Sequence, residues 1–197
     1  MKELEYPFDA AYIIKKRKSL KKVLLADGTS RIRKKIAVFG GSTTSDIVKT
    51  LELFLLDAGI EPEFYESEYA QYFQDAMFPD ETLLSFKPDI VFIHTTNRNV
   101  TDWPEMTDTT EQIDEKLHTE INRFTEMWKS IAEKFHCPII QNNFEMPLYR
   151  LLGSRDAWDI HGRTNFLTRL TKLFTPTHAK MRAFIFTIST LFLPITA

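Results

Sequence analysis

Hydrophobic and polar positions follow two different periods along this chain. From residue 109 to residue 136, an apolar side chain recurs every three or four positions, which is typical of one face of a helix. Shorter segments rich in apolar residues predict strands instead, and these segments lie at 36–39, 63–65, 89–95 and 138–141. Strands that alternate with helices favour a parallel sheet with helices on both faces.

Apolar residues at helical spacing also predict four shorter helices, one before the first strand and three between the strands. These helices lie at 9–26, 46–58, 69–77 and 79–86. Asp9 is placed to cap the first of these helices, because a carboxylate can accept a hydrogen bond from the helical backbone. Four consecutive apolar residues at 90–93 predict a strand that is buried on both faces of the sheet. The pattern therefore predicts an α/β fold, a three-layer sandwich with a parallel sheet, preceded by an N-terminal helix.

The composition is that of a globular protein of one domain, or of one domain with an appendage. Of its 197 residues, 43% are hydrophobic and 26% are charged. A formal net charge of −2 argues against a dedicated nucleic-acid binder, and a single cysteine excludes a disulfide within the chain. No secretory leader is recognisable, so we expect a cytoplasmic protein without a membrane anchor.

Positive charge is concentrated at the start of the chain. Residues 1–35 contain eleven Lys or Arg and four Asp or Glu. A solvated face of an N-terminal helix is the simplest interpretation of this basic region. The alternative is a docking face for an acidic partner or a phosphate group.

The segment 35–45 is the first candidate for a functional site. It predicts a buried strand that ends in two glycines and continues through four hydroxyl residues into a helix. Such a turn places Ser42 at the carboxyl edge of the sheet, where open α/β folds bind their ligands. Ser42 can act there as a nucleophile, with backbone N–H groups around Gly41 and Thr43 as oxyanion or substrate-binding donors. The alternative is a tight glycine turn whose hydroxyl groups cap the helix.

Polar loops after two further strands are predicted at the same edge. Asn97 follows the strand at 89–95, and its amide can donate a hydrogen bond to an oxyanion. Asn142 follows the strand at 138–141 and is a second candidate for substrate binding. A simpler interpretation of both loops is that they are polar turns.

His161 is the candidate catalytic base. The carboxylates of Asp156 and Asp159 are close in sequence and can orient its ring, as a base requires. Ser42, His161 and Asp159 together would form the catalytic group of a serine hydrolase. The alternative is a structural or simply exposed histidine. We expect no metal site and no cofactor in this chain.

Ser42, Asn97 and His161, in this order and each in a loop of a parallel α/β chain, resemble the arrangement of SGNH hydrolases. The stretch from about residue 35 to 170 more closely resembles the N-terminal domain of FkbH-like proteins of the haloacid-dehalogenase (HAD) superfamily, of the HAD IIIC phosphatase type. The segments that carry this resemblance are IAVFGGSTTSDI, PDIVFIHTTNRNV and HGRTNFL.

The resemblance implies an SGNH- or flavodoxin-like domain that precedes a HAD domain. It implies phosphatase chemistry, or the transfer of a glyceryl unit from a phosphorylated glycerate to an acyl carrier protein. Mg²⁺ is implied only for the HAD domain.

Three departures from these families weigh against a complete catalytic unit. SGNH hydrolases use a glycine after the second strand as an oxyanion donor, and segment 66–80 contains no glycine. They place an aspartate three residues before the histidine, where this chain has Trp158. No Asp-x-Asp-x-Thr or Asp-x-Asp-x-Val sequence occurs, so the HAD nucleophile is absent from this chain.

The character of the chain changes after residue 171. The thirteen residues 183–195 carry no charge, and this run is too short to span a bilayer as a helix. Codons for this tail also permit a shifted reading frame that encodes an amphipathic helix and a strand. We therefore expect a basic helical appendage (1–34), an SGNH-like domain (35–171) and a frameshifted tail (172–197) of a truncated longer protein.

The sequence predicts a substrate-, carrier- or partner-binding domain of an FkbH-like HAD-family protein that lacks the HAD catalytic motif. Its expected partners are an acyl carrier protein or a phosphorylated small molecule, and neither nucleic acid nor a membrane. The alternative is an SGNH-type serine esterase that uses Ser42 and His161. A third possibility is a folding remnant without function.

Overall fold

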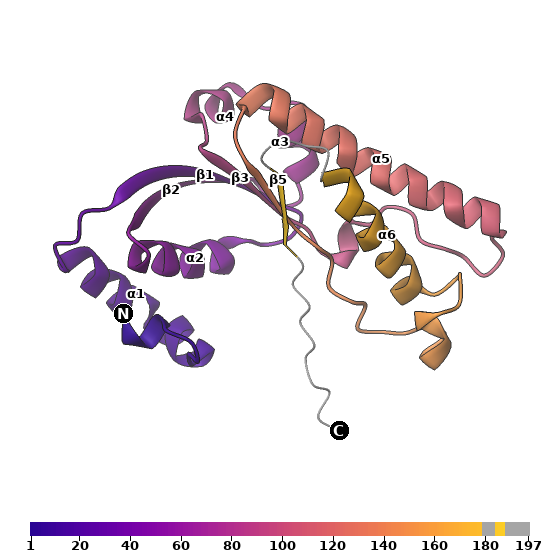
Figure 1. Cartoon of the computed structure of the whole chain (residues 1–197), viewed down its shortest axis with the longest axis horizontal. Coiled ribbons are helices and arrows are strands. Elements are labelled where there is room, and N and C mark those ends of the chain that lie inside the picture. Colours follow the sequence, from indigo (N-terminus) through magenta and orange to yellow (C-terminus); the bar gives the residue numbers. More distant parts are fainter. Residues whose placement is uncertain (179–183, 188–197) are drawn as a thin grey trace.

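The computed structural model describes residues 1–178 and 184–187, and a parallel sheet lies at its centre (Figure 1). The spatial order of the strands is β2-β1-β3-β4-β5, and each neighbouring pair is parallel. The strands are β1 (Ile32–Gly40), β2 (Ile60–Glu66), β3 (Ile90–His94), β4 (Ile139–Asn142) and β5 (Phe184–Thr187). The chain moves outward from β1 to β2, then returns past β1 and builds the other half of the sheet, as in doubly wound folds.

Helices cover both faces of this sheet. α2 lies on one face with α1 on its outer side, and α3, α4 and α5 lie on the other face, with α6 beside α5 (Figure 1). The helices are α1 (Ala10–Ala26), α2 (Ser45–Asp57), α3 (Tyr72–Met77), α4 (Glu81–Phe86), α5 (Thr110–Phe135) and α6 (Arg163–His178). Short 3₁₀ turns lie at η1 (Lys2–Leu4), η2 (Asn97–Asn99) and η3 (Gly153–Ala157). The predicted three-layer sandwich with a preceding helix is confirmed.

Local signals in the sequence account for the helix boundaries. The carboxylate of Asp9 accepts a hydrogen bond from the backbone N–H of Tyr12 at 3.0 Å and caps α1, as predicted. α5 begins with a capping box in which Thr109 and Gln112 each bind the other's backbone. Its predicted apolar stripe is buried from Ile113 to Ile131.

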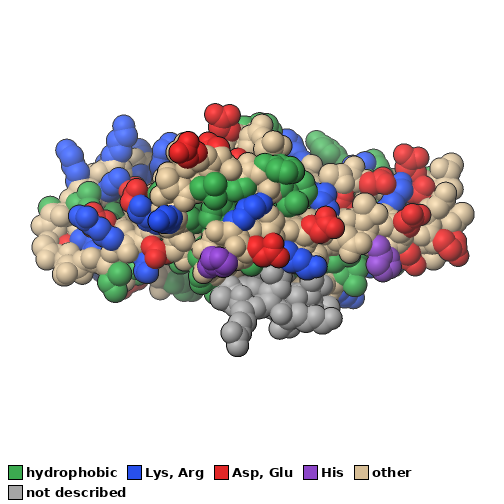
Figure 2. All heavy atoms as spheres, turned by 90° about the horizontal axis from the view of Figure 1, so that it is seen from above, with side chains coloured by type: hydrophobic (Ala, Val, Ile, Leu, Met, Phe, Trp, Pro, Cys, Tyr) green, Lys and Arg blue, Asp and Glu red, His purple; other side chains and the backbone are tan. Residues whose placement is uncertain are grey.

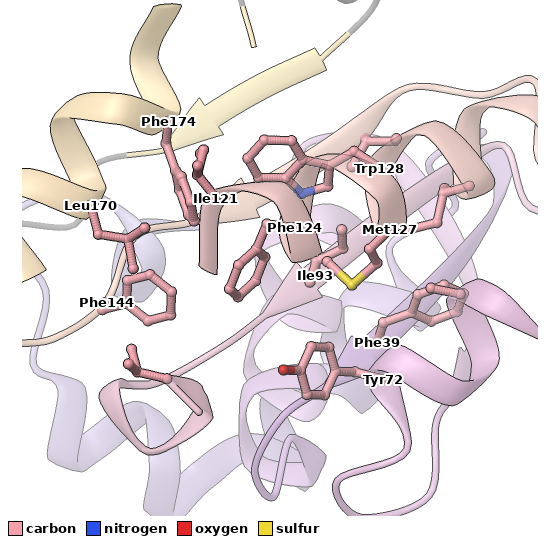
Figure 3. Packing of buried hydrophobic residues seen from close by; sticks show 14 of the residues in the cluster. Phe39, Tyr72, Ile93, Ile121, Phe124, Met127, Trp128, Phe144, Leu170 and Phe174 are labelled. Carbon is pink, nitrogen blue, oxygen red and sulfur yellow. The ribbon is translucent and has the colours of Figure 1, made fainter. Parts of the chain in front are cut away.

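The main core lies between α5, α6 and one face of the sheet. Figure 3 shows the rings of Phe124, Trp128, Phe144 and Phe174 gathered there. The centroid of the Phe174 ring lies 5.1 Å from that of Phe124 and 5.0 Å from that of Trp128. A second apolar cluster joins α1 to α2, and its buried members are Leu4, Ile13, Leu20, Leu24, Leu53 and Leu56.

The burial of β3 corrects one prediction. Val91 and Ile93 are fully buried beneath α5, but Ile90, Phe92 and His94 on the opposite face are only half-buried. That face is less covered because α2 packs along β2, at the other side of β1. The strand is therefore buried on one face and partly covered on the other.

β1 begins four residues before the predicted strand. Its charged first half is stabilised by pairing with β2, where Arg33 lies 3.4 Å from the carboxylate of Glu61. At the other end of the chain, α6 continues without a break to His178, past the predicted boundary at 171. The division into three segments stays a prediction, and residues 179–183 and 188–197 of the predicted tail lie outside the described residues. Within the described ranges, no helix combines the length and the apolar character that crossing a membrane requires.

Candidate functional site

The carboxyl ends of β1 and β3 meet at the point where the order of the strands reverses. In open α/β sheets, ligands bind in the crevice outside the strands at this switch point. The turn after β1 is held against β3, because the N–H of Gly41 donates to the carbonyl of His94 at 2.8 Å. The predicted edge of the sheet around Ser42 is therefore at the switch point.

Asn99 joins the loop after β3 to this turn. Its side-chain amide donates to the carbonyl of Gly41 at 2.9 Å, and its oxygen accepts from the N–H of Thr96 at 2.8 Å. A Cβ atom at Gly41 would lie 2.4 Å from the Asn99 oxygen, so this close approach requires glycine. Asn97 is the residue predicted from the sequence of this loop, and Asn99 was missed, although the Thr-x-x-Asn spacing of a capping box is present.

An ion pair on α5, between the buried Glu120 and the partly buried Arg123, holds the backbone around Asn99. The carboxylate of Glu120 is completely buried and accepts from the N–H of Thr101 at 2.7 Å and from Arg123 at 2.8 Å. Arg123 also donates to the carbonyl of Asn99 at 2.7 Å and to the hydroxyl of Tyr72 at 2.9 Å. Burial alone would lower the pKa of Arg123, but Tyr72 and Glu120 hold that pKa above its usual value.

The side chains of Asn97 and Asn142 bind backbone groups of the protein, and neither contacts the turn after β1 among the hydrogen bonds of the described residues. The amide of Asn97 donates to the carbonyl of Glu145 at 3.3 Å, which links the loops after β3 and β4. Asn142 pairs with both backbone groups of Thr95, at 2.9 and 2.8 Å, and so extends the pairing of the two strands. Both amides already have protein acceptors, and their roles as substrate or oxyanion donors stay predictions.

The hydroxyl residues before α2 differ in exposure. Ser42 is half-buried, Thr43 is exposed and Thr44 is buried at the N-cap position. The Thr44 side chain accepts no hydrogen bond from the helix. The first N–H groups of α2 therefore have no cap from that residue, and they lie at the positive end of the helix dipole.

His161 is held by two acceptors. Its Nδ1 lies 2.9 Å from the carboxylate of Asp159, and its Nε2 lies 3.1 Å from the backbone carbonyl of Asp108. The hydrogen bond to Asp159, followed by that to Asp108, raises the pKa of His161, because both acceptors favour the doubly protonated ring. Among the hydrogen bonds of the described residues, none joins His161 to Ser42. The structure contains the predicted contact between His161 and Asp159, and a catalytic role for these residues with Ser42 stays a prediction.

The other candidate carboxylate has a structural role. Asp156 is fully buried, and its oxygen accepts from the N–H of Thr164 at 2.8 Å, in the first turn of α6. Burial favours a raised pKa for Asp156, but hydrogen bonds from Thr164 hold that pKa below its usual value. Asp156 therefore stabilises the start of α6, whereas Asp159 orients the His161 ring.

The loop after β4 exposes several large apolar side chains near the switch point. Its contact with Asn97 through Glu145 places it beside the loop after β3. Leu148 is 89% exposed and Tyr149 is 83% exposed. Met146, Leu151 and Trp158 are exposed as well. Exposed apolar side chains in a continuous segment are a common mark of an interaction surface.

The described residues contain no cluster of three or more His, Cys, Asp or Glu that could hold a metal ion. Nothing among them fits the Mg²⁺ that the resemblance implies for a further domain.

Cys137 is half-buried, and burial raises the pKa of its thiol to about 11.

Comparison with known proteins supports the fold and no specific activity. A scan against models of protein families gave no match, and a search of curated proteins gave none either. Among solved structures, the chain is similar to the N-terminal part of a Bacteroides fragilis protein that contains a phosphatase domain and was solved with Mg. The TM-score is 0.67 at 17% sequence identity, and the match covers 86% of this chain and 44% of the other.

The chain thus spans less than half the length of that neighbour. A second match is a candidate acylhydrolase of the same species, with a TM-score of 0.46 and 14% identity, covering 91% of this chain and 77% of the other. At these identities, the first likeness establishes the α/β fold with a parallel sheet between helices, and the second adds no argument.

Proposed function

We propose that this chain is a binding domain of a phosphatase-associated protein, and that it holds a ligand or partner at the switch point without hydrolysing it. The position of His161 is the main support for this proposal. Both of its ring nitrogens face acceptors, Asp159 and the carbonyl of Asp108, so neither offers a lone pair to the hydroxyl of Ser42. A serine without a base in reach is a weak nucleophile.

The turn at 41–44 favours an anionic ligand. Backbone N–H groups at the start of α2 lack a cap from Thr44, and the helix dipole favours negative charge beside them. A phosphate group on a small molecule has the charge and the acceptor oxygens for this position. The ligand we propose is a phosphorylated small molecule, such as a phosphorylated glycerate.

A macromolecular partner would contact the exposed apolar loop after β4. Leu148, Tyr149 and Trp158 provide the aromatic and aliphatic side chains that dominate protein interfaces. The partner we propose for this surface is a HAD-type phosphatase domain, with an acyl carrier protein as the carrier that delivers or receives the substrate. The fold neighbour supports this arrangement, because its N-terminal part contains a phosphatase domain.

The alternative function is an SGNH-type serine esterase that uses Ser42 and His161. The hydrogen bond between His161 and Asp159 favours it, because an oriented histidine is half of a catalytic group. This function requires the ring to leave the carbonyl of Asp108 and turn its Nε2 toward Ser42.

Amide NMR spectroscopy and ester hydrolysis together test the proposal. Titration with inorganic phosphate, a phosphorylated glycerate and an acyl carrier protein should shift the amide signals of Gly41, Ser42 and Asn99 with at least one of these probes. Hydrolysis of 4-nitrophenyl acetate should be the same in wild type and Ser42→Ala. Hydrolysis lost in Ser42→Ala and in His161→Gln would establish the esterase instead, and unchanged amide signals with every probe would reject the binding function.

A further inference from the structure

Some basic residues of the N-terminal region form ion pairs with carboxylates, and others form none among the described residues. α1 contains six Lys or Arg and no Asp or Glu. Arg17 lies 2.8 Å from the carboxylate of Asp46, and Lys21 lies 2.7 Å from that of Glu52, so two of the six tie α1 to α2. The other four, Lys15, Lys16, Lys18 and Lys22, are exposed and have no ion pair among the described residues.

Three of these lysines form a stripe on the outer face of α1. Lys15, Lys18 and Lys22 are three and four residues apart, so they are neighbours along one side of the helix. The opposite side is buried against α2 through Ile13 and Leu20. Each like-charged pair at this spacing destabilises a helix by about 0.2–0.5 kcal/mol. None of the three lysines has an ion-pair partner among the described residues, and an external anionic group would offset this repulsion.

Two lysines of the stripe, Lys15 and Lys18, also line a groove between α1 and α2. The groove has a volume of about 540 Å³. Its wall on α2 includes Lys49, which also has no ion pair among the described residues, and Glu52, whose charge is paired with Lys21. The side chain of Leu53 lies beneath this wall and is almost completely buried. Ile14 of α1 lines it as well, with 56% of the residue exposed. The groove therefore combines apolar surface with a cationic rim.

We infer that this groove, defined by Ile14, Lys15, Lys18 and Lys49, docks an acidic amphipathic helix of a partner protein. The lysine stripe extends over eight residues, from Lys15 to Lys22, or about 10 Å along the helix. Carboxylates on a partner helix, spaced every three or four residues, repeat at the same interval and can face Lys15, Lys18 and Lys22. Apolar side chains on the same partner helix would then contact Ile14, which is exposed.

Two features favour a protein helix over other anionic surfaces. A helix that lies on a membrane turns its apolar face outward, whereas the main apolar face of α1 is already buried against α2. Nucleic acid favours a protein with a basic surface overall, whereas the net charge here is −2. In Figure 2, Lys and Arg side chains gather toward the end with the N-terminal elements, and Asp and Glu predominate at the end where α5 begins. A partner with acidic charge is thus directed to one end of the molecule.

This inference goes beyond the proposed function and does not depend on it. The groove is formed by the sides of α1 and α2, whereas the proposed ligand site is formed by loops at the carboxyl ends of β1 and β3. Loss of helix binding at the groove would leave ligand binding at the ends of β1 and β3 unchanged, and loss of ligand binding would leave helix binding unchanged.

Fluorescence anisotropy with a labelled synthetic helix tests the inference on the full chain. The probe carries leucine along one face and glutamate along the other. Wild type should bind it, and the affinity should fall as salt is raised. The variant Lys15→Glu/Lys18→Glu should bind about tenfold more weakly, because two attractive contacts become repulsive. Lys15→Gln/Lys18→Gln should lose about threefold, since it removes the attraction only.

The matched control is Lys129→Glu/Lys172→Glu, which changes the net charge by the same amount at two exposed lysines elsewhere. This control should bind the probe as wild type does, and circular dichroism should give the same helix content for all variants. No binding by wild type, or an equal loss in the control, would overturn the inference. Tighter, Lys15-dependent binding to phosphatidylglycerol vesicles than to the peptide would replace it with a membrane surface.

Discussion

Replacing Arg123 with methionine removes the cation that holds the loop of Asn99 in place. The Arg123→Met variant keeps an unbranched apolar stem against the Phe124 ring, whose centroid lies 4.5 Å from the guanidinium in the native chain. It leaves the completely buried carboxylate of Glu120 without its ion-pair partner. It also leaves the carbonyl of Asn99 without the donor that lies 2.7 Å away.

The expected loss of stability follows from these contacts. Removing one partner of a buried ion pair costs about 3–5 kcal/mol, and each lost hydrogen bond adds about 1 kcal/mol. Retained packing of the stem and hydrogen bonds from Thr101 to Glu120 offset part of this sum. We expect a loss of about 4 kcal/mol, which lowers the melting temperature by about 10 °C for a domain of this size.

Urea unfolding followed by tryptophan fluorescence measures this loss. Arg169→Met is the matched control, because it breaks an ion pair between Arg169 and Asp114 that is partly exposed on both sides and should cost about 1 kcal/mol or less. The double variant Glu120→Gln/Arg123→Met should be more stable than Arg123→Met, because glutamine removes the uncompensated charge. A cost below about 1 kcal/mol for Arg123→Met, or a double variant less stable than the single one, would show that the ion pair does not stabilise this loop.

Three further predictions concern stability and reactivity. Gly162→Ala should cost about 3 kcal/mol in urea unfolding, because a Cβ atom there would lie 2.1 Å from the backbone oxygen of Asp156. The hydrogen bond to Asp159 raises the pKa of His161 above its ordinary value of 6.5. The protonated, hydrogen-bonded ring therefore contributes its full stabilisation of the fold below pH 6.5. This stabilisation decreases as pH rises through the raised pKa. The stability lost in His161→Gln should accordingly be larger at low than at high pH. Alkylation of Cys137 by iodoacetamide should rise with pH toward its pKa of about 11, rather than level off near the ordinary thiol value of 9.

Controls separate these effects from general destabilisation. Gly28→Ala places a Cβ atom in open space and meets only the strain of a positive φ, so it should cost about 1 kcal/mol. An equal cost for Gly162→Ala would contradict the steric argument. A pH-independent effect of His161→Gln, or alkylation of Cys137 as fast as that of a free thiol at the same pH, would contradict the other two.

Much of the architecture follows from local patterns in the sequence. The apolar stripe of α5 and the cap at Asp9 were predictable because spacing and capping chemistry act over a few residues. The half-covered face of β3 was not predictable, because it depends on where α2 lies across the sheet. A run of apolar residues such as Ile90–Ile93 is the same in a strand covered on both faces and in one covered on a single face.

Contacts between residues far apart in the sequence also limited the prediction of the candidate site. The pairing of His161 with Asp159 is local and was anticipated, but the carbonyl that holds the other ring nitrogen comes from Asp108, more than fifty positions earlier. Glu120 and Arg123 flank the apolar stripe of α5 and look like solvent-facing charges in the sequence. Their burial, and hence the choice of Asn99 rather than Asn97 at the turn, depends on long-range packing that spacing does not encode.

Covalent labelling of Ser42 is the most direct test of the central claim, that this is a binding domain in which the serine has no base. Wild type is incubated with a fluorophosphonate probe, and intact-protein and peptide mass spectrometry locate any adduct. We expect no adduct on Ser42, because Nε2 of His161 is held by the carbonyl of Asp108. A stoichiometric adduct on Ser42 that disappears in His161→Gln would contradict it and establish a serine hydrolase.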